Sequence, residues 1–233
     1  MVDVEQRSLD QTLDSFYKDN LNFGVEDLQE QQSNQPEQIP QIKLTHAMSK
    51  NFLANGMLSQ PGRFYHTGKK AEYSIIDCHI LYIKKTYIKQ SARIKASTGA
   101  DKRMTYIIGA MMEDTGEPFL TFIKGANLPI YWKFQKELLD TMQEIKTPMF
   151  ALTIRLSQTD TSTDHGVLAV IKPTILKLEN GLVQKVTDLS KLEAIKQQAI
   201  DIKEVIEKMG EKEPVSAVDI EDHYSKMADE QNL

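Results

Sequence analysis

The sequence is poor in cysteine and has no long apolar run. Its single cysteine, Cys78, excludes an intramolecular disulfide and any cysteine-rich zinc site. No stretch approaches the roughly 20 consecutive apolar residues that a membrane-spanning helix needs. The first residues also lack the charged and then apolar pattern of a signal peptide. We therefore expect no membrane association and a cytoplasmic location.

The motifs of common enzymes are also missing. The sequence contains no G-x-x-x-x-G-K-[ST], no G-x-G-x-x-G, no H-E-x-x-H and no G-x-S-x-G. Cys78 and His79 are neighbours in a predicted strand, so their side chains point to opposite faces and cannot form a catalytic dyad. The five histidines show no metal-ligand spacing, and the segment from Asp160 to Asp164 lacks the glycine and distal glutamate of a calcium loop. We expect neither an enzyme, nor a metal site, nor a cofactor.

Charged residues are segregated along the chain, although the formal net charge is only −5. Residues 1–42 carry nine acids and two bases, and residues 211–233 carry seven acids and two bases. Residues 43–178 carry nineteen bases and eleven acids, whereas residues 179–210 are nearly balanced. A basic centre favours an anionic partner, and acidic ends of this kind are typical of interaction tails. A solvated surface without a partner is the alternative.

The acidic N-terminal segment, residues 1–42, is expected to be an arm and a linker. Leucines and a phenylalanine at roughly helical spacing predict an amphipathic helix over residues 9–21. Residues 28–42 are rich in Gln and Pro and have little to bury, so we expect a flexible linker there. A short helix over residues 44–57 would then lead into the core.

Residues 43–178 have the pattern of a β-rich basic core. The first of five predicted strands is long and is expected to bend or bulge midway. The strands are expected at residues 72–95, 104–112, 118–124, 149–157 and 167–178, with a helix at residues 128–145. Asn127 would cap this helix, and Pro173 predicts an edge position for the last strand. The order β-β-β-α-β-β lacks the alternating helices of a doubly wound fold and favours a five-stranded OB-fold-like barrel.

The segment from residue 179 to residue 210 contains a second helical pattern. Apolar residues recur at spacings of three and four over residues 189–209, with Ser190 and Glu193 as a capping box. We expect this amphipathic helix to dock on its own domain, and a contact in a homodimer is the alternative. The tail, residues 211–233, is acidic, has almost no core-forming run and is expected to be disordered. The predicted fold class is therefore mainly β with flanking helices, a C-terminal helix and a disordered acidic tail.

The stretch LYIKKTYIKQSARIK, residues 81–95, alternates apolar or aromatic residues with cations. In an OB-fold the ligand lies across the second and third strands, and single-stranded nucleic acid needs cations there for its phosphates and aromatic faces for its bases. Strands also favour aromatic residues and solvent-facing lysines for packing and edge protection, which is the alternative explanation. The predicted nucleic-acid-binding residues are Arg63, Tyr65, Lys69, Lys70, Tyr82, Lys84, Lys85, Tyr87, Lys89, Arg93, Lys95, Lys102, Arg103, Tyr106, Phe122, Lys124 and Arg155.

The layout of a basic OB-like core followed by an acidic tail resembles the single-stranded DNA-binding proteins of bacteriophages and bacteria. In size and layout it is most similar to those of tailed phages, and the stretch GEPFLTFIKGANLPIYWKFQKELL…PMFALTIRL is similar in texture to phage and plasmid proteins of this class. The resemblance implies sequence-tolerant binding of single-stranded DNA in DNA replication or recombination. It also implies that the tail recruits replication and recombination proteins or competes with DNA, in the host cytoplasm for a phage protein. The chain ends Asp229-Glu230-Gln231-Asn232-Leu233, without the aromatic tip typical of such tails.

A function of another class is also consistent with the sequence. The chain would then be a non-catalytic interaction or assembly protein, such as a virion or scaffold component, that oligomerises through the helix at residues 189–209. The placement of the cations separates the two hypotheses. Cations that line one groove with aromatic residues between them favour nucleic acid, and cations scattered over all faces favour assembly. The sequence does not distinguish DNA from RNA.

Overall fold

An antiparallel sheet of five strands organises the computed structural model, which describes residues 12–21, 39–45, 62–89, 99–100, 102–163 and 166–209. Its strands are β4 (Ile76–Lys89), β5 (Lys102–Met112), β6 (Pro118–Lys124), β7 (Ile154–Thr163) and β8 (Gly166–Ile175). A smaller sheet contains β1 (Ile42–Leu44), β2 (Phe64–His66) and β3 (Ala71–Tyr73). The helices are α4 (Leu128–Ile145), α5 (Leu189–Met209), a helical segment at residues 12–19, and the 3-10 segments η1 (Gly125–Asn127) and η2 (Met149–Ala151). The predicted mainly-β class with flanking helices is confirmed.

The strands of the larger sheet lie in the order β6-β5-β4-β7-β8, with β4 in the centre. The predicted chain order of three strands, a helix and two strands is confirmed, because α4 lies between β6 and β7. The outermost strands, β6 and β8, are not neighbours in the sheet, so a closed barrel is not confirmed. Pro173 does lie on an edge strand, as predicted. The backbone N–H of Ile171, two residues earlier, points away from β7 and donates to Oδ1 of Asn127 at 2.6 Å.

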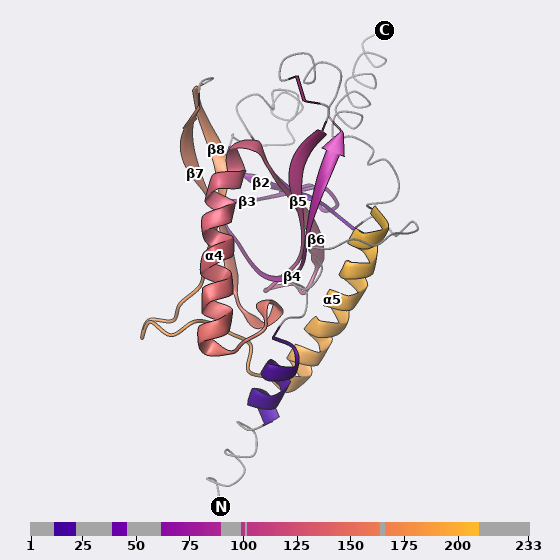
Figure 1. Ribbon diagram of the computed structural model, residues 1–233, viewed down its shortest axis with the longest axis vertical. Coiled ribbons are helices and arrows are strands. Elements are labelled where there is room, and N and C mark those ends of the chain that lie inside the picture. Colours follow the sequence, from indigo (N-terminus) through magenta and orange to yellow (C-terminus); the bar gives the residue numbers. More distant parts are fainter. Residues whose placement is uncertain are drawn as a thin grey trace, which may run out of the picture.

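Both faces of the sheet are covered where β4 and β5 cross the middle of the molecule (Figure 1). On one face, α4 contributes Tyr131, Phe134, Leu138 and Met142 to a core that also includes side chains of β7 and β8. On the other face, α5 packs against β4 and β5 in a second core, which the helix at residues 12–19 joins through the ring of Phe16 against Phe150 of η2. A strand buried on both faces reads as a continuous apolar run, which explains the ILYI sequence at residues 80–83.

The predicted irregularity in the first long strand is confirmed as a shift of register in β4. Ile80 pairs with Ala110 of β5 and Tyr82 pairs with Gly109, so Leu81 is the extra residue of a bulge. Because of this insertion, Leu81 and Tyr82 both belong to the core under α5, while Ile80 and Ile83 belong to the core under α4. The bulge therefore decides which side chains beyond it face α5.

Several predicted strand boundaries were wrong. Residues 72 and 73, placed in the first long strand, belong to β3 of the smaller sheet, and β4 begins at Ile76. Residues 149–151, placed in a strand, form η2, and β7 begins at Ile154. All three residues of η2 are buried, so the segment lacks the half-buried pattern of a surface strand. The polar residues 158–163, placed in a loop, continue β7 and pair with β8 up to Thr163 and Gly166. Their threonines are β-branched and suit a strand, although the pattern has no apolar face.

The predicted helix caps were also partly wrong. Asn127 precedes α4 and Pro129 lies in its first turn, as expected, but the Asn127 side chain accepts from β8 rather than from α4. At the start of α5, Asp188 and not Ser190 is the cap. Its Oδ1 accepts from the backbone N–H of Lys191 at 2.9 Å. Hydrogen bonds from the Ser190 hydroxyl and from this N–H hold the pKa of Asp188 below its usual value.

Several expectations for the chain ends lie outside the described residues. The helix predicted at residues 9–21 is confirmed over residues 12–19, and Leu13 is buried as expected. Leu44, predicted to begin a short helix, is the last residue of β1 instead, and residues 46–61 are not described. Residues 28–38 of the predicted linker and the acidic tail at residues 211–233 also lie outside the described part of the chain, whereas Ile42, at the end of the predicted linker, is buried in β1.

The amphipathic stripe of α5 docks on the chain's own sheet, as predicted. Its buried residues are Leu192, Ile195, Ala199, Ile202 and Ile206. The closest approach is at Gly109 of β5, where an added Cβ would overlap Cγ2 of Ile202 and lie 2.9 Å from Cδ1 of Ile206. Only a residue without a side chain leaves room for α5 at this position.

We expect Gly109→Ala to destabilise the fold, because the new methyl group would overpack the contact with α5, at a cost of about 1–3 kcal/mol. Ile202→Ala removes the clashing methyl group but leaves a cavity of its own. The double variant should therefore be destabilised by less than the sum of the two single destabilisations, by a difference of at least about 1 kcal/mol. Urea unfolding of the wild type, both single variants and the double variant measures this coupling. Strictly additive costs would show that α5 does not dock over Gly109.

Candidate nucleic-acid interface

The predicted binding residues separate into groups at opposite ends of β5. Lys69 and Lys70 lie in the turn after β2, and Lys69 forms an ion pair with Glu117 in the turn between β5 and β6. Arg155 donates to both carboxylate oxygens of Asp77, at 2.8 and 2.7 Å. These hydrogen bonds raise the pKa values of Lys69 and Arg155. An extended strand of the length of β5 spans about 30 Å, so Lys69 lies far from the cations where β5 begins.

Three of the predicted stacking tyrosines belong to the core. Tyr65, Tyr82 and Tyr106 are only 5%, 0% and 6% exposed. The ring of Tyr106 packs against Tyr131 of α4, with 4.8 Å between the ring centroids. Phe122 is half-buried against the core under α5. None of the three tyrosine rings is accessible to a base in this structure, so their expected stacking role is corrected to a packing role.

The C-terminal part of α5 occupies the middle of the predicted binding track. The carboxylate of Glu207 accepts from the hydroxyl of Tyr82 and from Nζ of Lys84, the latter at 2.6 Å. The Nζ atom of Lys203 lies 5.8 Å from the centroid of the Tyr82 ring. The expectation of one continuous track along β4, β5 and β6 was therefore wrong. Glu207 was not predicted to take part in the site. The sequence feature that could have indicated it is an acid directly beside the apolar stripe near the end of α5.

The ends of β4, β5 and β6 are rich in cations, of which Lys84 pairs with Glu207 of α5. Figure 1 shows β5 and β6 reaching past the C-terminal end of α5. We call residues 84–89, 102–105 and 122–124 the strand-end region. It contains no Asp or Glu. Its cations are Lys84, Lys85, Lys89, Lys102, Arg103 and Lys124. Of the predicted sites this is the part that the structure does bring together, whereas Arg93 and Lys95 lie outside the described residues and Arg63 is half-buried before β2.

The pairing register divides the strand-end region into two faces. Lys85 lies opposite Tyr106, Tyr87 opposite Met104, and Lys89 opposite Lys102. Because side chains alternate along a strand, these pairs share the face that continues into the α4 core. Lys84, Arg103 and Lys124 lie on the face toward α5. Like charges lie directly opposite each other at Lys89 and Lys102, and such pairs repel across a strand pair.

Tyr87 is the one predicted aromatic residue that the described structure leaves open. Its side chain is 57% exposed. The Nζ atom of Lys85, on the same face, lies 6.0 Å from the centroid of its ring. An exposed ring beside lysines offers a flat apolar surface for a base and a cation close enough for the phosphate of the same nucleotide. This is the combination that single-stranded nucleic acid requires.

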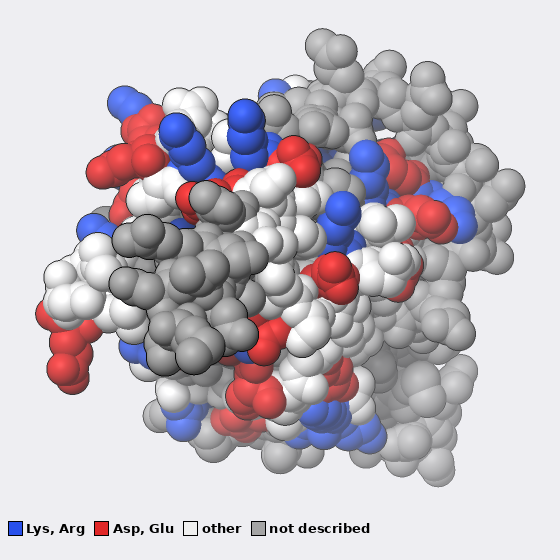
Figure 2. All heavy atoms as spheres, turned by 90° about the horizontal axis from the view of Figure 1, so that it is seen from below, with Lys and Arg blue, Asp and Glu red and all other residues white. Residues whose placement is uncertain are grey.

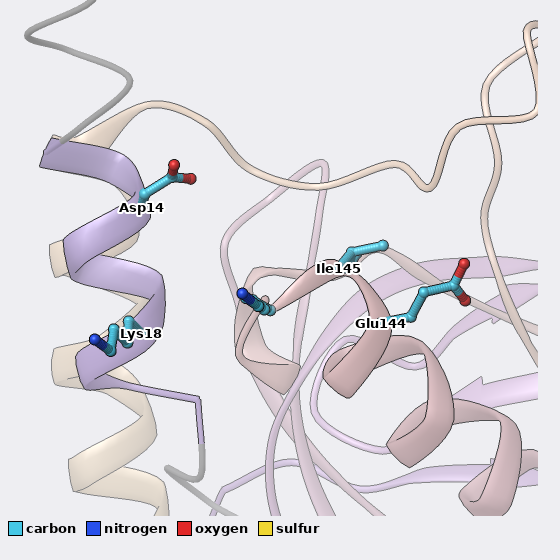
Figure 3. A pocket seen from close by; sticks show the side chains of 5 residues that line it. Asp14, Lys18, Glu144 and Ile145 are labelled. Atoms are coloured by element: carbon cyan, nitrogen blue, oxygen red, sulfur yellow. The ribbon is translucent and has the colours of Figure 1, made fainter.

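The opposite end of the molecule has a different electrostatic character. Figure 2 views that end and shows Lys and Arg interspersed with Asp and Glu, without a region of one sign. A hollow there lies between the helix at residues 12–19 and the C-terminal end of α4 (Figure 3). It is lined by Asp14, Lys18, Glu144, Ile145 and Lys146. The lining carries both signs of charge and contains no histidine or cysteine.

Catalytic and metal-binding arrangements are not found among the described residues. Cys78 is fully buried in the core under α4, where desolvation raises the pKa of its thiol. His79 is buried as well, and its Nδ1 lies 3.0 Å from the carbonyl oxygen of Leu152. Within the described part of the chain no three His, Cys, Asp or Glu side chains converge as metal ligands would. No described helix combines the length and apolarity needed to cross a bilayer.

We expect the stability of the fold to fall as the pH drops from about 6.5 to about 4, because burial lowers the pKa of His79 from 6.5 to about 4. In this pH range His79 is protonated in the unfolded chain but not in the folded one. The free energy of unfolding therefore falls by up to about 1.4 kcal/mol per pH unit. His66, whose pKa is also lowered by burial, acts in the same direction. Urea unfolding should show a shallower pH dependence for His79→Asn, whose amide nitrogen takes the place of Nδ1 and can still donate to Leu152. An unchanged slope would assign the acid sensitivity to other groups.

No family model, no curated protein and no solved structure matches the chain. The resemblance to the single-stranded DNA-binding proteins of phages and bacteria therefore remains a prediction from the layout of the sequence. What the chain binds has to be inferred from the chemistry of the strand-end region.

Proposed function

We propose that the protein binds single-stranded nucleic acid, with DNA as the first candidate, at the strand-end region of β4, β5 and β6. The observation that carries this proposal is the exposed ring of Tyr87, which shares one face of the sheet with three lysines in a region whose own sequence contains no acid. The path we favour runs over Lys85, Tyr87, Lys89 and Lys102, which share one face. Phosphates would meet the lysines, and a base would stack on the tyrosine.

The composition of this surface sets the character of the binding. One exposed aromatic ring supports one stacked base, which contributes about 1–3 kcal/mol and demands no particular base. The remaining attraction comes from phosphate neutralisation, which is independent of sequence and weakens steeply with salt. Stacking requires a base that is not already paired, so a single strand suits the surface better than a duplex. We therefore expect moderate, sequence-tolerant and strongly salt-dependent binding.

The topology supports the same proposal at the level of the fold. The chain order of three strands, a helix and two strands, with the first strand central, is that of an OB-like sheet whose closing contact is missing. In OB-folds the loops after the first and fourth strands flank the ligand. The corresponding hairpins here are β4–β5 and β7–β8, and both project toward the upper end in Figure 1. This likeness is an analogy of architecture and supports the location of the site more than its chemistry.

A role in DNA replication or recombination follows if the strand is DNA. The acidic residues 211–233 would then recruit other replication or recombination proteins, in the cytoplasm of the cell or of an infected host. The alternative function, assembly through the helix at residues 189–209, loses its proposed surface. The apolar stripe of that helix is buried on β4, β5 and η2 of the same chain. A homodimer would need a different contact.

We expect fluorescence anisotropy to show binding of an oligo-dT strand that weakens steeply between about 50 and about 200 mM salt. Replacing Lys85, Lys89 and Lys102 together by glutamine should lower the slope of log K against log salt by about 2, since each lost phosphate contact removes about 0.7. The matched control replaces three exposed lysines of α4 and its end, Lys133, Lys136 and Lys146, by glutamine. Equal effects of the two triple variants, or no binding by the wild type at low salt, would contradict the proposal.

Tyr87→Ala should weaken oligo-dT binding by about 5- to 150-fold, the equivalent of one lost stacking contact of about 1–3 kcal/mol. Tyr87→Phe keeps the ring and serves as the control, with an affinity within about twofold of the wild type. The anisotropy assay at low salt measures both variants. If Tyr87→Ala and Tyr87→Phe bind alike, Tyr87 does not stack on a base.

A further inference from the structure

The carboxylate of Glu207 occupies a position where two donors of β4 converge. The Tyr82 hydroxyl and the Lys84 ammonium both donate to it, and Lys84 Nζ also lies 3.5 Å from the backbone carbonyl oxygen of Glu207. The Lys84 and Glu207 side chains are only 15% and 21% exposed, so water screens the pair little. Lys84 is at the same time the first cation of the strand-end region.

Glu207 lies at a place where the helix itself does not favour an acid. It is in the last turn of α5, where the carbonyl ends of the helix dipole favour cations and disfavour carboxylates. Lys208, the next residue, follows the usual preference. The stabilising partner of Glu207 is therefore in the sheet, across the interface, rather than in its own helix.

The same geometry suits a phosphodiester. A phosphate oxygen accepts from a hydroxyl and an ammonium as a carboxylate oxygen does, and it carries the same formal charge of one negative unit per group. Resting on the proposed function, we infer that Tyr82 and Lys84 form a latent phosphate position that Glu207 of α5 keeps closed. A bound nucleic-acid strand extends onto the α5 face of the sheet when one of its phosphates replaces the Glu207 carboxylate at Tyr82 and Lys84.

The exchange does not require α5 to leave the sheet. The buried anchors nearest to Glu207 are Ile202 and Ile206, which pack over Gly109. Glu207 itself is followed by only two residues of α5, and the ends of helices fray. Removing the carboxylate without a substitute would leave the half-buried Lys84 ammonium unpaired, which is costly. An incoming anion avoids that cost, so the opening is coupled to the ligand.

Glu207→Gln tests this inference, because the amide keeps an acceptor for Tyr82 but no longer neutralises Lys84. Its control is Glu204→Gln in the same helix, which removes the same charge from an exposed pair with Lys208 at 3.6 Å. We expect Glu207→Gln to bind oligo-dT several-fold more tightly at low salt, with a salt slope steeper by about 0.7, the value for one added phosphate contact. Glu204→Gln should leave the slope unchanged.

Lys84→Gln in the Glu207→Gln background should return the salt slope to that of the wild type, since the added contact is then lost. Circular dichroism melting of each variant shows that α5 remains docked. If Glu207→Gln and Glu204→Gln shift the binding equally, or the added slope survives the loss of Lys84, Glu207 is only a structural partner and the inference fails while the proposed function stands. If no variant binds at all, the proposed function fails with it.

Discussion

The packing of α5 onto the exposed face of β4 and β5 determines how the rest of the surface can be used. Ile202 and Ile206 fit over Gly109, and the contact buries the middle of the sheet on its second face. The strands β4 and β5 extend past the part that α5 covers, and their uncovered ends contain different types of residue. Apolar residues fill the covered part, and cations with Tyr87 fill the uncovered part. A single interface thus separates a buried half of β4 from a half whose side chains alternate between half-buried and exposed.

This division explains why one stretch of sequence carries two kinds of tyrosine. Tyr82 and Tyr87 lie five residues apart in β4, and both were predicted to stack on bases. The bulge at Leu81 turns Tyr82 toward α5, where its hydroxyl is satisfied by Glu207 and its ring is buried. Tyr87 lies past the end of α5 on the other face and remains exposed. Local sequence around the two residues is nearly the same, so only the tertiary cover separates them.

Elements with a strong local period could be predicted from the sequence, and contacts between distant elements could not. The helix at residues 128–145, the strand at 118–124 and the stripe of α5 follow from spacing that the chain repeats over several turns or residues. The buried 3-10 segment η2 depends on its packing against β4 and α5, which are far along the chain, and the strand character of residues 158–163 depends on pairing with β8. The cap at Asp188 is a local contact with Lys191 that the spacing of apolar residues does not reveal. The same limit applied to the site. Its cations were visible in the sequence, whereas the ion pair of Arg155 with Asp77 and the cover over Lys84 required the fold.

An acidic chain can hold a polyanion if its charges are separated by more than the screening length. The formal net charge is −5, which would repel nucleic acid if all charges acted from one point. The Debye length is about 8 Å at physiological ionic strength, so a strand responds mainly to charges within about that distance. The turn between β5 and β6, with its acids Glu113, Asp114 and Glu117, lies about 30 Å along β5 from Lys102. A nucleic-acid strand bound as proposed would therefore meet the cations of the strand-end region while those acids are screened. Lowering the salt would lengthen the reach of both signs of charge. Local charge, not the total, decides whether this surface attracts a phosphate backbone.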